Sequence, residues 1–197
     1  PDVGQRGARG ALGQMVTARR DEGSRAVEPI RTAVSTGHGV GKTYIAALAV
    51  LWYLYRHRGA KVITTAPTAR QVEQLLWAEI RSAVGRASVR LPGAMTLTQM
   101  KLADDWFATG ITTSQRTLET TSTRFQGYHS AHVMVVLDEA TGVDRRIWEA
   151  CEGLALGDDD RFLAVGNPTD PESRFREVVL SSAWNTVRLN AREHPNV

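Results

Sequence analysis

The pattern of hydrophobic and polar positions changes near residue 31. Residues 1–30 are rich in glycine, arginine and small polar side chains and show no sustained period, so we expect a partly flexible N-terminal arm. From residue 31 onward, apolar runs of strand length alternate with segments whose apolar residues recur at helical spacing. We therefore expect one α/β domain over residues 31–197.

Strands and helices alternate along this domain. The predicted strands cover residues 31–35, 61–66, 132–137, 161–165 and 184–190, and the predicted helices cover residues 41–57, 68–84 and 145–154. Residues 88–121 are rich in threonine and suit short antiparallel strands or a hairpin. A repeated order of strand, helix and strand indicates a mainly parallel central sheet that is flanked by helices on both faces.

The composition fits such a domain and excludes several other classes of protein. The chain is 42% hydrophobic and 23% charged, which is typical of a globular domain and not of a disordered or collagen-like chain. Its single cysteine excludes a disulfide framework and a thiolate zinc site. Because the chain has no apolar run long enough for a membrane helix and opens with no signal peptide, we expect a cytoplasmic protein with no membrane partner.

The net charge adds little to this picture. The 24 basic and 21 acidic residues leave a surplus of +3, which permits a polyanionic partner without requiring one. Nearly all the basic residues are arginine, which forms bidentate contacts with phosphate, although codon bias explains this preference equally well. The first residue is Pro1 and not methionine, so we expect the chain to be a piece of a longer protein.

The segment between the first predicted strand and the first predicted helix carries the most specific signal. Its glycines allow successive backbone N–H groups to point at phosphate oxygens, and the start of the helix adds its positive dipole end. In such a loop Lys42 contacts the β- and γ-phosphates of a nucleotide, and the Thr43 hydroxyl binds Mg²⁺. The expected nucleotide-binding residues are Thr36, Gly37, His38, Gly39, Val40, Gly41, Lys42 and Thr43.

Two other interpretations of this segment compete with the phosphate loop. The usual phosphate-loop spacing places a glycine at the position of Thr36, and here Gly37 and Gly39 supply the backbone freedom instead. A dinucleotide-binding fingerprint is the nearest rival, but Lys42 stands where its third glycine would be. An ordinary helix start is the other alternative. The strand before the glycines and the helix after them favour the phosphate loop.

A second signal is the acidic end of the predicted strand 132–137. In phosphate-loop enzymes such a strand is the Walker B element, in which Asp138 would hold Mg²⁺ and Glu139 would orient or deprotonate the attacking water. The alternative is that Asp138 caps a helix. Because the same chain carries a phosphate loop, the pair favours a Mg²⁺-dependent ATPase, a phosphoanhydride hydrolase that takes ATP as its substrate.

Polar residues also flank the predicted strand 161–165. Asn167 follows this strand, and we expect it to act as a coupling or sensor residue that contacts the catalytic water or the γ-phosphate. A plain β-turn is the alternative, because Asn-Pro is a strong turn former. Asp158, Asp159 and Asp160 precede the strand, and we expect them to form a solvated loop.

Together these segments resemble the ATPase domain of bacteriophage terminase large subunits, the motors that package DNA. The resemblance rests on residues 35–43, residues 135–140 and residues 166–168, and the phosphate loop of that family commonly lacks its first glycine. Residues 64–68, with the amphipathic helix after them, resemble the helicase-type motif Ia of the same group. The resemblance implies a P-loop NTPase fold of the additional-strand (ASCE, RecA/helicase-like) type over residues 31–197.

The resemblance also implies a function and partners. It implies an ATP-hydrolysing motor that drives double-stranded DNA into a procapsid in the host cytoplasm. The implied partners are neighbouring subunits of a homo-oligomeric ring, the portal protein and the small terminase subunit. A neighbouring subunit would supply an arginine finger, for which Arg124 is the candidate and a surface arginine the alternative. The family's C-terminal nuclease domain would be absent from this chain.

Two alternative functions remain at this stage. One is a helicase-like or other nucleic-acid remodelling P-loop ATPase. The other is a nucleotide-binding assembly module with little turnover. Hydrolysis that rises with protein concentration or with DNA would favour the motor, whereas tight ATP binding without hydrolysis would favour the module.

Overall fold

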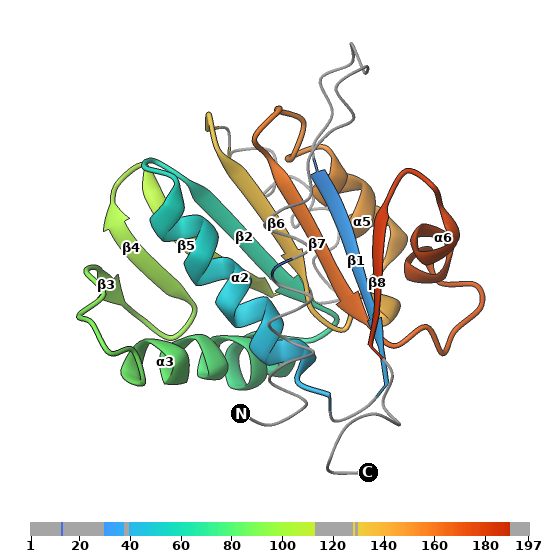
Figure 1. The fold of residues 1–197 in the computed structure, drawn as a ribbon, viewed down its shortest axis with the longest axis horizontal. Helices are drawn as coiled ribbons and strands as arrows, with labels where there is room; N and C mark the ends of the chain where they lie inside the picture. The colour runs from blue at the N-terminus through green and yellow to red at the C-terminus, as the bar shows by residue number, and fades with distance from the viewer. Residues whose placement is uncertain (1–12, 14–29, 38–39, 113–127, 129, 190–197) are drawn as a thin grey trace.

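The computed structural model describes Gly13 and residues 30–37, 40–112, 128 and 130–189. The strands are β1 (Ile30–Thr36), β2 (Lys61–Ala66), β3 (Ala94–Met95), β4 (Gln99–Ala103), β5 (Trp106–Thr112), β6 (Val133–Leu137), β7 (Arg161–Gly166) and β8 (Asn185–Leu189). Within the described residues they form one eight-stranded sheet in the order β3-β4-β5-β2-β6-β7-β1-β8 (Figure 1).

The order of the central strands sets the class of the fold. The strands from β5 to β8 run parallel, and β3 and β4 complete the sheet in antiparallel pairs. β7 lies between β1 and β6 and pairs in parallel with both, as in the register pairs Ser35↔Gly166 and Leu137↔Ala164. A strand inserted at this place is the mark of the additional-strand class, so the predicted fold class is confirmed.

Helices cover both faces of the sheet. On the near face in Figure 1 lies α2 (Lys42–Arg56), beside a π-helical turn η1 (Gln71–Leu76) that continues into α3 (Trp77–Gly85). The far face carries α5 (Arg145–Glu152) and α6 (Arg174–Leu180), and the short 3₁₀ helix η3 (Ala140–Gly142) follows β6.

Each central strand contributes to two hydrophobic cores, because successive side chains point to opposite faces of a sheet. In β6, Met134 and Val136 pack in the core beneath α2, whereas Val135 packs in the core beneath α5 and α6. All five residues of β6 are buried. This double burial explains why the strand is a continuous apolar run in the sequence.

The predicted elements agree with the structure to within three residues at each end, with two exceptions. Helix α6 was not predicted. Residues 88–121 were placed in a separate antiparallel unit, whereas β5 pairs in parallel with β2 over its whole length, from Lys61↔Phe107 to Ala66↔Thr112. The predicted N-terminal arm lies outside the described residues except for Gly13 and Ile30, and Ile30 already belongs to β1.

The prediction of a solvated loop before β7 is wrong for Asp160. Its side chain is buried, and its carboxylate accepts hydrogen bonds from the N–H groups of Val133 at 2.8 Å, Leu156 at 2.9 Å and Gly157 at 2.6 Å. Backbone N–H groups compensate the cost of burying a carboxylate. Asp160 therefore ties the loop to the start of β6, while its two neighbours, Asp158 and Asp159, are exposed as predicted.

In the part of the chain that the structure describes, no helix combines the length and the apolar character that crossing a bilayer would require.

Candidate nucleotide-binding site

The two predicted motifs lie at the same edge of the sheet. β1 leads into the glycine-rich loop and α2, and β6 leads into Asp138 and Glu139. Because these strands are parallel, both loops leave the sheet at its carboxyl edge, which is the lower edge in Figure 1. One strand, β7, separates them.

An ion pair joins the two loops across this gap. The Nζ atom of Lys42 lies 3.2 Å from Oε1 of Glu139. The lysine side chain is 7% exposed and the glutamate side chain 32% exposed, so the pair is partly shielded from solvent. A lysine ammonium that is buried this deeply requires a compensating charge, and Glu139 supplies it here.

The phosphate loop depends on a glycine at the start of α2. Gly41 has φ 80°, in the left-handed region, and nothing lies within 4 Å of where its Cβ would be. The glycine is therefore needed for its backbone conformation and not for space. At the other end of the loop, Thr36 is buried and its hydroxyl donates to the Gly37 carbonyl at 3.2 Å. His38 and Gly39 lie outside the described residues.

Asp138 is fully buried at the end of β6. Burial, followed by the charge of Glu139, raises the pKa of its carboxyl to about 6. The Glu139 N–H, the nearby Thr43 hydroxyl and the Lys42 ammonium act in the opposite direction. Oδ1 accepts the Glu139 N–H at 3.1 Å, whereas the buried Oδ2 receives no hydrogen bond of ordinary length from the described residues.

This arrangement suits a bound cation. A buried carboxylate oxygen without a hydrogen-bond partner is costly, and a cation would remove that cost. The groups that meet here, the Asp138 carboxylate and the Thr43 hydroxyl, are oxygen donors, which Mg²⁺ prefers. The residues present therefore fit the predicted magnesium site.

The backbone of Glu139 is strained. With φ 48° and ψ 45°, Glu139 is the only non-glycine residue among those described that has a positive φ. This conformation costs an L-residue roughly 1–2 kcal/mol, and it persists only where the surroundings impose it. Strain at a carboxylate beside a phosphate loop indicates a functional constraint.

The end of β2 forms a further wall beside this turn. The Thr65 carbonyl accepts the N–H of Asp138 at 3.0 Å, and a Cβ added to Gly142 would lie 2.9 Å from Cγ of Pro67. Thr64 is also buried, and its hydroxyl accepts the indole N–H of Trp77 at 3.0 Å. The motif Ia segment is thus packed against the Walker B turn.

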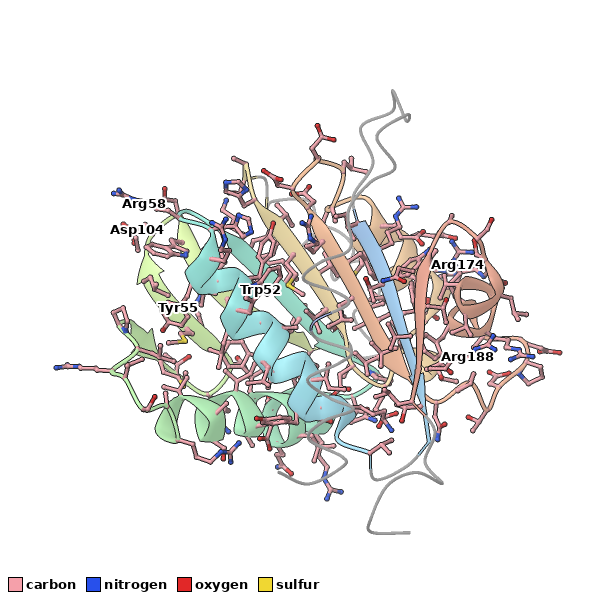
Figure 2. The ribbon with its side chains drawn as sticks, viewed as in Figure 1. Trp52, Tyr55, Arg58, Asp104, Arg174 and Arg188 are labelled. Atoms are coloured by element: carbon pink, nitrogen blue, oxygen red, sulfur yellow. The ribbon has the colours of Figure 1, made fainter. Side chains whose placement is uncertain are left out.

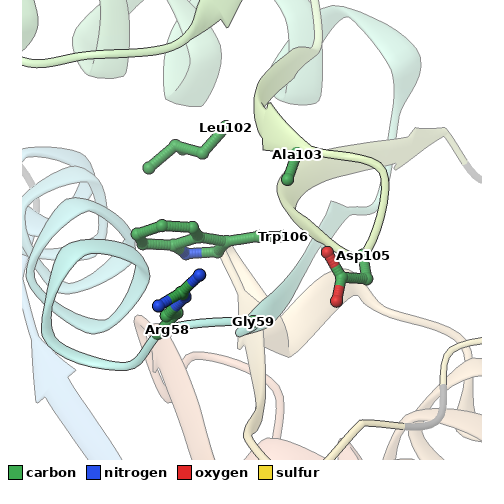
Figure 3. Close-up of a pocket in the computed structure, with 6 residues that line it drawn as sticks. All are labelled: Arg58, Gly59, Leu102, Ala103, Asp105 and Trp106. Atoms are coloured by element: carbon green, nitrogen blue, oxygen red, sulfur yellow. The ribbon is translucent and has the colours of Figure 1, made fainter.

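A separate cavity of about 470 Å³ lies at the opposite edge of the sheet. It is formed where α2 ends and β5 begins, and Figure 2 places Arg58 at that upper edge. The predicted site residues take no part in it. Its lining residues are Arg58, Gly59, Leu102, Ala103, Asp105 and Trp106 (Figure 3).

Comparison with known proteins agrees with this geometry. Residues 23–176 match the model of a family described as AAA domain. The chain belongs to the AAA domain family.

The relatives of this AAA domain include terminases. The chain is 27% identical over 181 residues to a probable terminase large subunit of Enterobacteria phage P7, and the match covers 84% of this chain and 36% of that protein. The full-length large terminase of a thermophilic bacteriophage has the same fold, with a TM-score of 0.67 at 12% identity over 93% of this chain and 44% of that one. That large terminase is also known in complex with ADP.

A solved ATPase domain gives a further match. The large terminase ATPase domain of Thermus phage P74-26 superposes with a TM-score of 0.57 at 15% identity, over 90% of this chain and 83% of that one. The predicted resemblance to terminase ATPase domains is confirmed. The AAA domain spans little more than a third of the phage P7 relative and less than half of the large terminase that is known with ADP.

The structure of the AAA domain brings some of the predicted site residues together. Lys42, Thr43, Asp138 and Glu139 meet in one place. Asn167 lies beside them at the end of β7, where its backbone carbonyl accepts a hydrogen bond from the Thr141 hydroxyl. The proposed contact of the Asn167 side chain with water or phosphate stays a prediction.

Other parts of the site are either undescribed or were not predicted. Arg124 lies outside the described residues. Thr141 and Gly166 were not among the predicted site residues, and no motif signals Thr141. Gly166 precedes the predicted Asn167 in the sequence, but its role as a close-packing position depends on contacts between distant segments.

The strain at Glu139 gives a testable difference in stability. Glu139→Gly and Glu139→Gln both remove the ion pair with Lys42, but only glycine adopts the left-handed conformation freely. We expect the glycine variant to have the higher free energy of unfolding by about 1 kcal/mol, measured by urea denaturation of the nucleotide-free protein. The same two changes at Glu149, an exposed position inside α5, should give the opposite order. Equal or reversed stabilities at Glu139 would show that its backbone is not strained.

Proposed function

We propose that this AAA domain is the Mg²⁺-dependent, ATP-hydrolysing motor domain of a viral terminase large subunit. The contact between Lys42 and Glu139 carries the proposal, because it unites the phosphate loop and the Walker B carboxylate in one site. The resemblance to terminase ATPase domains supports the assignment.

Nucleotide binding would use residues 36–43. The backbone N–H groups of the loop and the start of α2 favour the negative charge of the phosphates. Lys42 would exchange its partner from the Glu139 carboxylate to the β- and γ-phosphates. This exchange replaces one anionic partner by another, so the buried ammonium keeps a compensating charge throughout.

Hydrolysis would use Glu139. Once Lys42 has moved to the phosphates, the Glu139 carboxylate is free to orient the attacking water and to accept its proton. Its backbone is already held in one conformation, so little reorganisation is needed before attack. Glu139 is the catalytic base in this proposal, and Asn167 is a coupling residue at the end of β7.

The Thr43 hydroxyl and the Asp138 carboxylate would hold Mg²⁺. When bound, the ion neutralises charge on the β- and γ-phosphate oxygens. Asp138 is fully buried at the end of a buried strand, so its carboxylate is fixed relative to the loop that contains Thr43. The unpartnered Oδ2 of Asp138 supports this assignment.

The partners follow from the terminase relatives. We infer double-stranded DNA, neighbouring copies of the subunit in a ring, the portal protein and the small terminase subunit as partners. Arg124 is proposed as the arginine finger that enters a neighbouring site. These assignments concern a whole protein, of which the chain covers 36% in its phage P7 relative.

Replacing the proposed base tests the catalytic assignment. Glu139→Gln should lower kcat for ATP hydrolysis by about 10²–10⁴-fold, because it removes the proton acceptor. Binding of ATP, measured by titration calorimetry, should change little. Glu149→Gln on α5 is the matched control and should hydrolyse ATP like the wild type. In the same assay, EDTA should stop hydrolysis and added Mg²⁺ should restore it. Wild-type turnover in Glu139→Gln would remove Glu139 from the mechanism, and hydrolysis in EDTA would remove the ion.

A second experiment tests the motor assignment. Hydrolysis per subunit should rise with protein concentration and with double-stranded DNA, because a trans arginine acts only between neighbours and contributes roughly 10³–10⁵-fold where it operates. Arg124→Ala should lose this rise, whereas Arg90→Ala, at an exposed position after α3, should keep it. Stimulation by single-stranded DNA alone would favour a helicase-like enzyme. A rate that ignores both concentration and DNA would contradict the motor.

A further inference from the structure

One side chain fastens the turn after β6 to the turn after β7. Thr141 lies in η3, two residues beyond Glu139, and its hydroxyl donates a hydrogen bond to the backbone carbonyl of Asn167, 26 residues away in the sequence. The same carbonyl accepts the N–H of Thr169 at 2.7 Å. The turn that carries the strained Glu139 is therefore connected to the turn that carries Asn167.

The two turns are also in close contact at Gly166. A Cβ added to this glycine would lie 3.2 Å from the Thr141 hydroxyl oxygen, 3.3 Å from the N atom of Ala140 and 3.1 Å from Cε1 of Phe175 in α6. A side chain at this position would have to push the turn or the helix away. The absence of a side chain lets η3, the end of β7 and α6 pack directly against one another.

Other contacts hold η3 to the rest of the fold. The indole N–H of Trp148 donates to the Ala140 carbonyl at 3.3 Å, and Gly142 lies against Pro67. These contacts attach η3 to α5 and to the end of β2. Among the described hydrogen bonds of η3, the bond made by Thr141 is the one that reaches the turn after β7.

The turn at Asn167 leads directly to α6. Ser173 caps this helix, with its hydroxyl oxygen accepting the N–H of Arg176 at 3.2 Å. Arg174, labelled in Figure 2, binds Glu152 of α5 at 3.0 Å and Glu177 at 2.9 Å. A displacement of the turn would therefore act on α6 and, through Arg174, on α5.

We propose that Thr141 is a positioning residue for hydrolysis. Its hydroxyl holds the strained turn in place through the Asn167 carbonyl and so fixes the Glu139 carboxylate where the water must be deprotonated. The same bond makes the turn after β7 follow any movement of Glu139. This inference rests on the proposed function, because it assigns to Thr141 an effect that is exerted through Glu139.

Substitutions at Thr141 separate its hydrogen bond from its shape. Thr141→Val keeps the branched shape but loses the donor, and it should lower kcat for ATP hydrolysis by about 10- to 100-fold, because the carboxylate is no longer fixed. KM for ATP should stay within about twofold, since Lys42 and the phosphate loop are unchanged. Thr141→Ser keeps the donor and should restore most of kcat. Thr141→Ala lacks the donor as well, and it replaces the valine variant if that variant does not fold.

A matched control addresses general loss of structure. The Thr186 hydroxyl donates to the Val179 carbonyl at 3.4 Å, which is also a bond from a threonine to the backbone, but it lies between β8 and α6. Thr186→Val should keep wild-type kcat while losing a similar amount of stability. Urea denaturation of both valine variants compares these losses.

A double-mutant cycle decides whether Thr141 acts through Glu139. In the Glu139→Gln background, Thr141→Val should cause no further loss of kcat, because the group that it positions is gone. Wild-type kcat in Thr141→Val, or an equal loss in both backgrounds, would overturn the positioning role while leaving the ATPase assignment intact. Absence of hydrolysis in the wild type, or full turnover in Glu139→Gln, would overturn both proposals.

Discussion

The ion pair between Lys42 and Glu139 is the interaction on which the candidate site depends. The two residues are far apart in the sequence and follow different strands, yet their charged atoms lie 3.2 Å apart. The contact is possible because β1, β7 and β6 run parallel, so that the loops that leave β1 and β6 meet at one edge of the sheet. The ion pair neutralises a lysine that the fold has buried and leaves it ready for a new anionic partner.

The neighbourhood of this pair favours chemistry at a cost in stability. Glu139 is held in a strained conformation, and the pKa of the buried Asp138 carboxyl is raised to about 6. Three segments share the work of holding this turn, since the ends of β2 and β7 and helix α5 all contact it. Such local costs persist where the surrounding structure imposes them, and they gather at functional sites.

Local patterns were sufficient to predict the two loops, and long-range contacts explain what could not be predicted. The glycine spacing before Lys42 and the apolar run before Asp138 carry their own physical explanation. The burial of Asp160, by contrast, depends on N–H groups of β6, and the bond from Thr141 depends on a carbonyl beyond β7. Helix α6 is only seven residues long, too short for a clear period, and the parallel pairing of β5 with β2 depends on sheet order.

A crystal structure of the protein with Mg²⁺ and a non-hydrolysable ATP analogue tests the account most directly. The account predicts that the phosphates lie against residues 36–43, that Lys42 has left Glu139 for the β- and γ-phosphates, and that the ion contacts Thr43 and Asp138. An analogue bound elsewhere, or an intact pair between Lys42 and Glu139 beside a bound nucleotide, would contradict it.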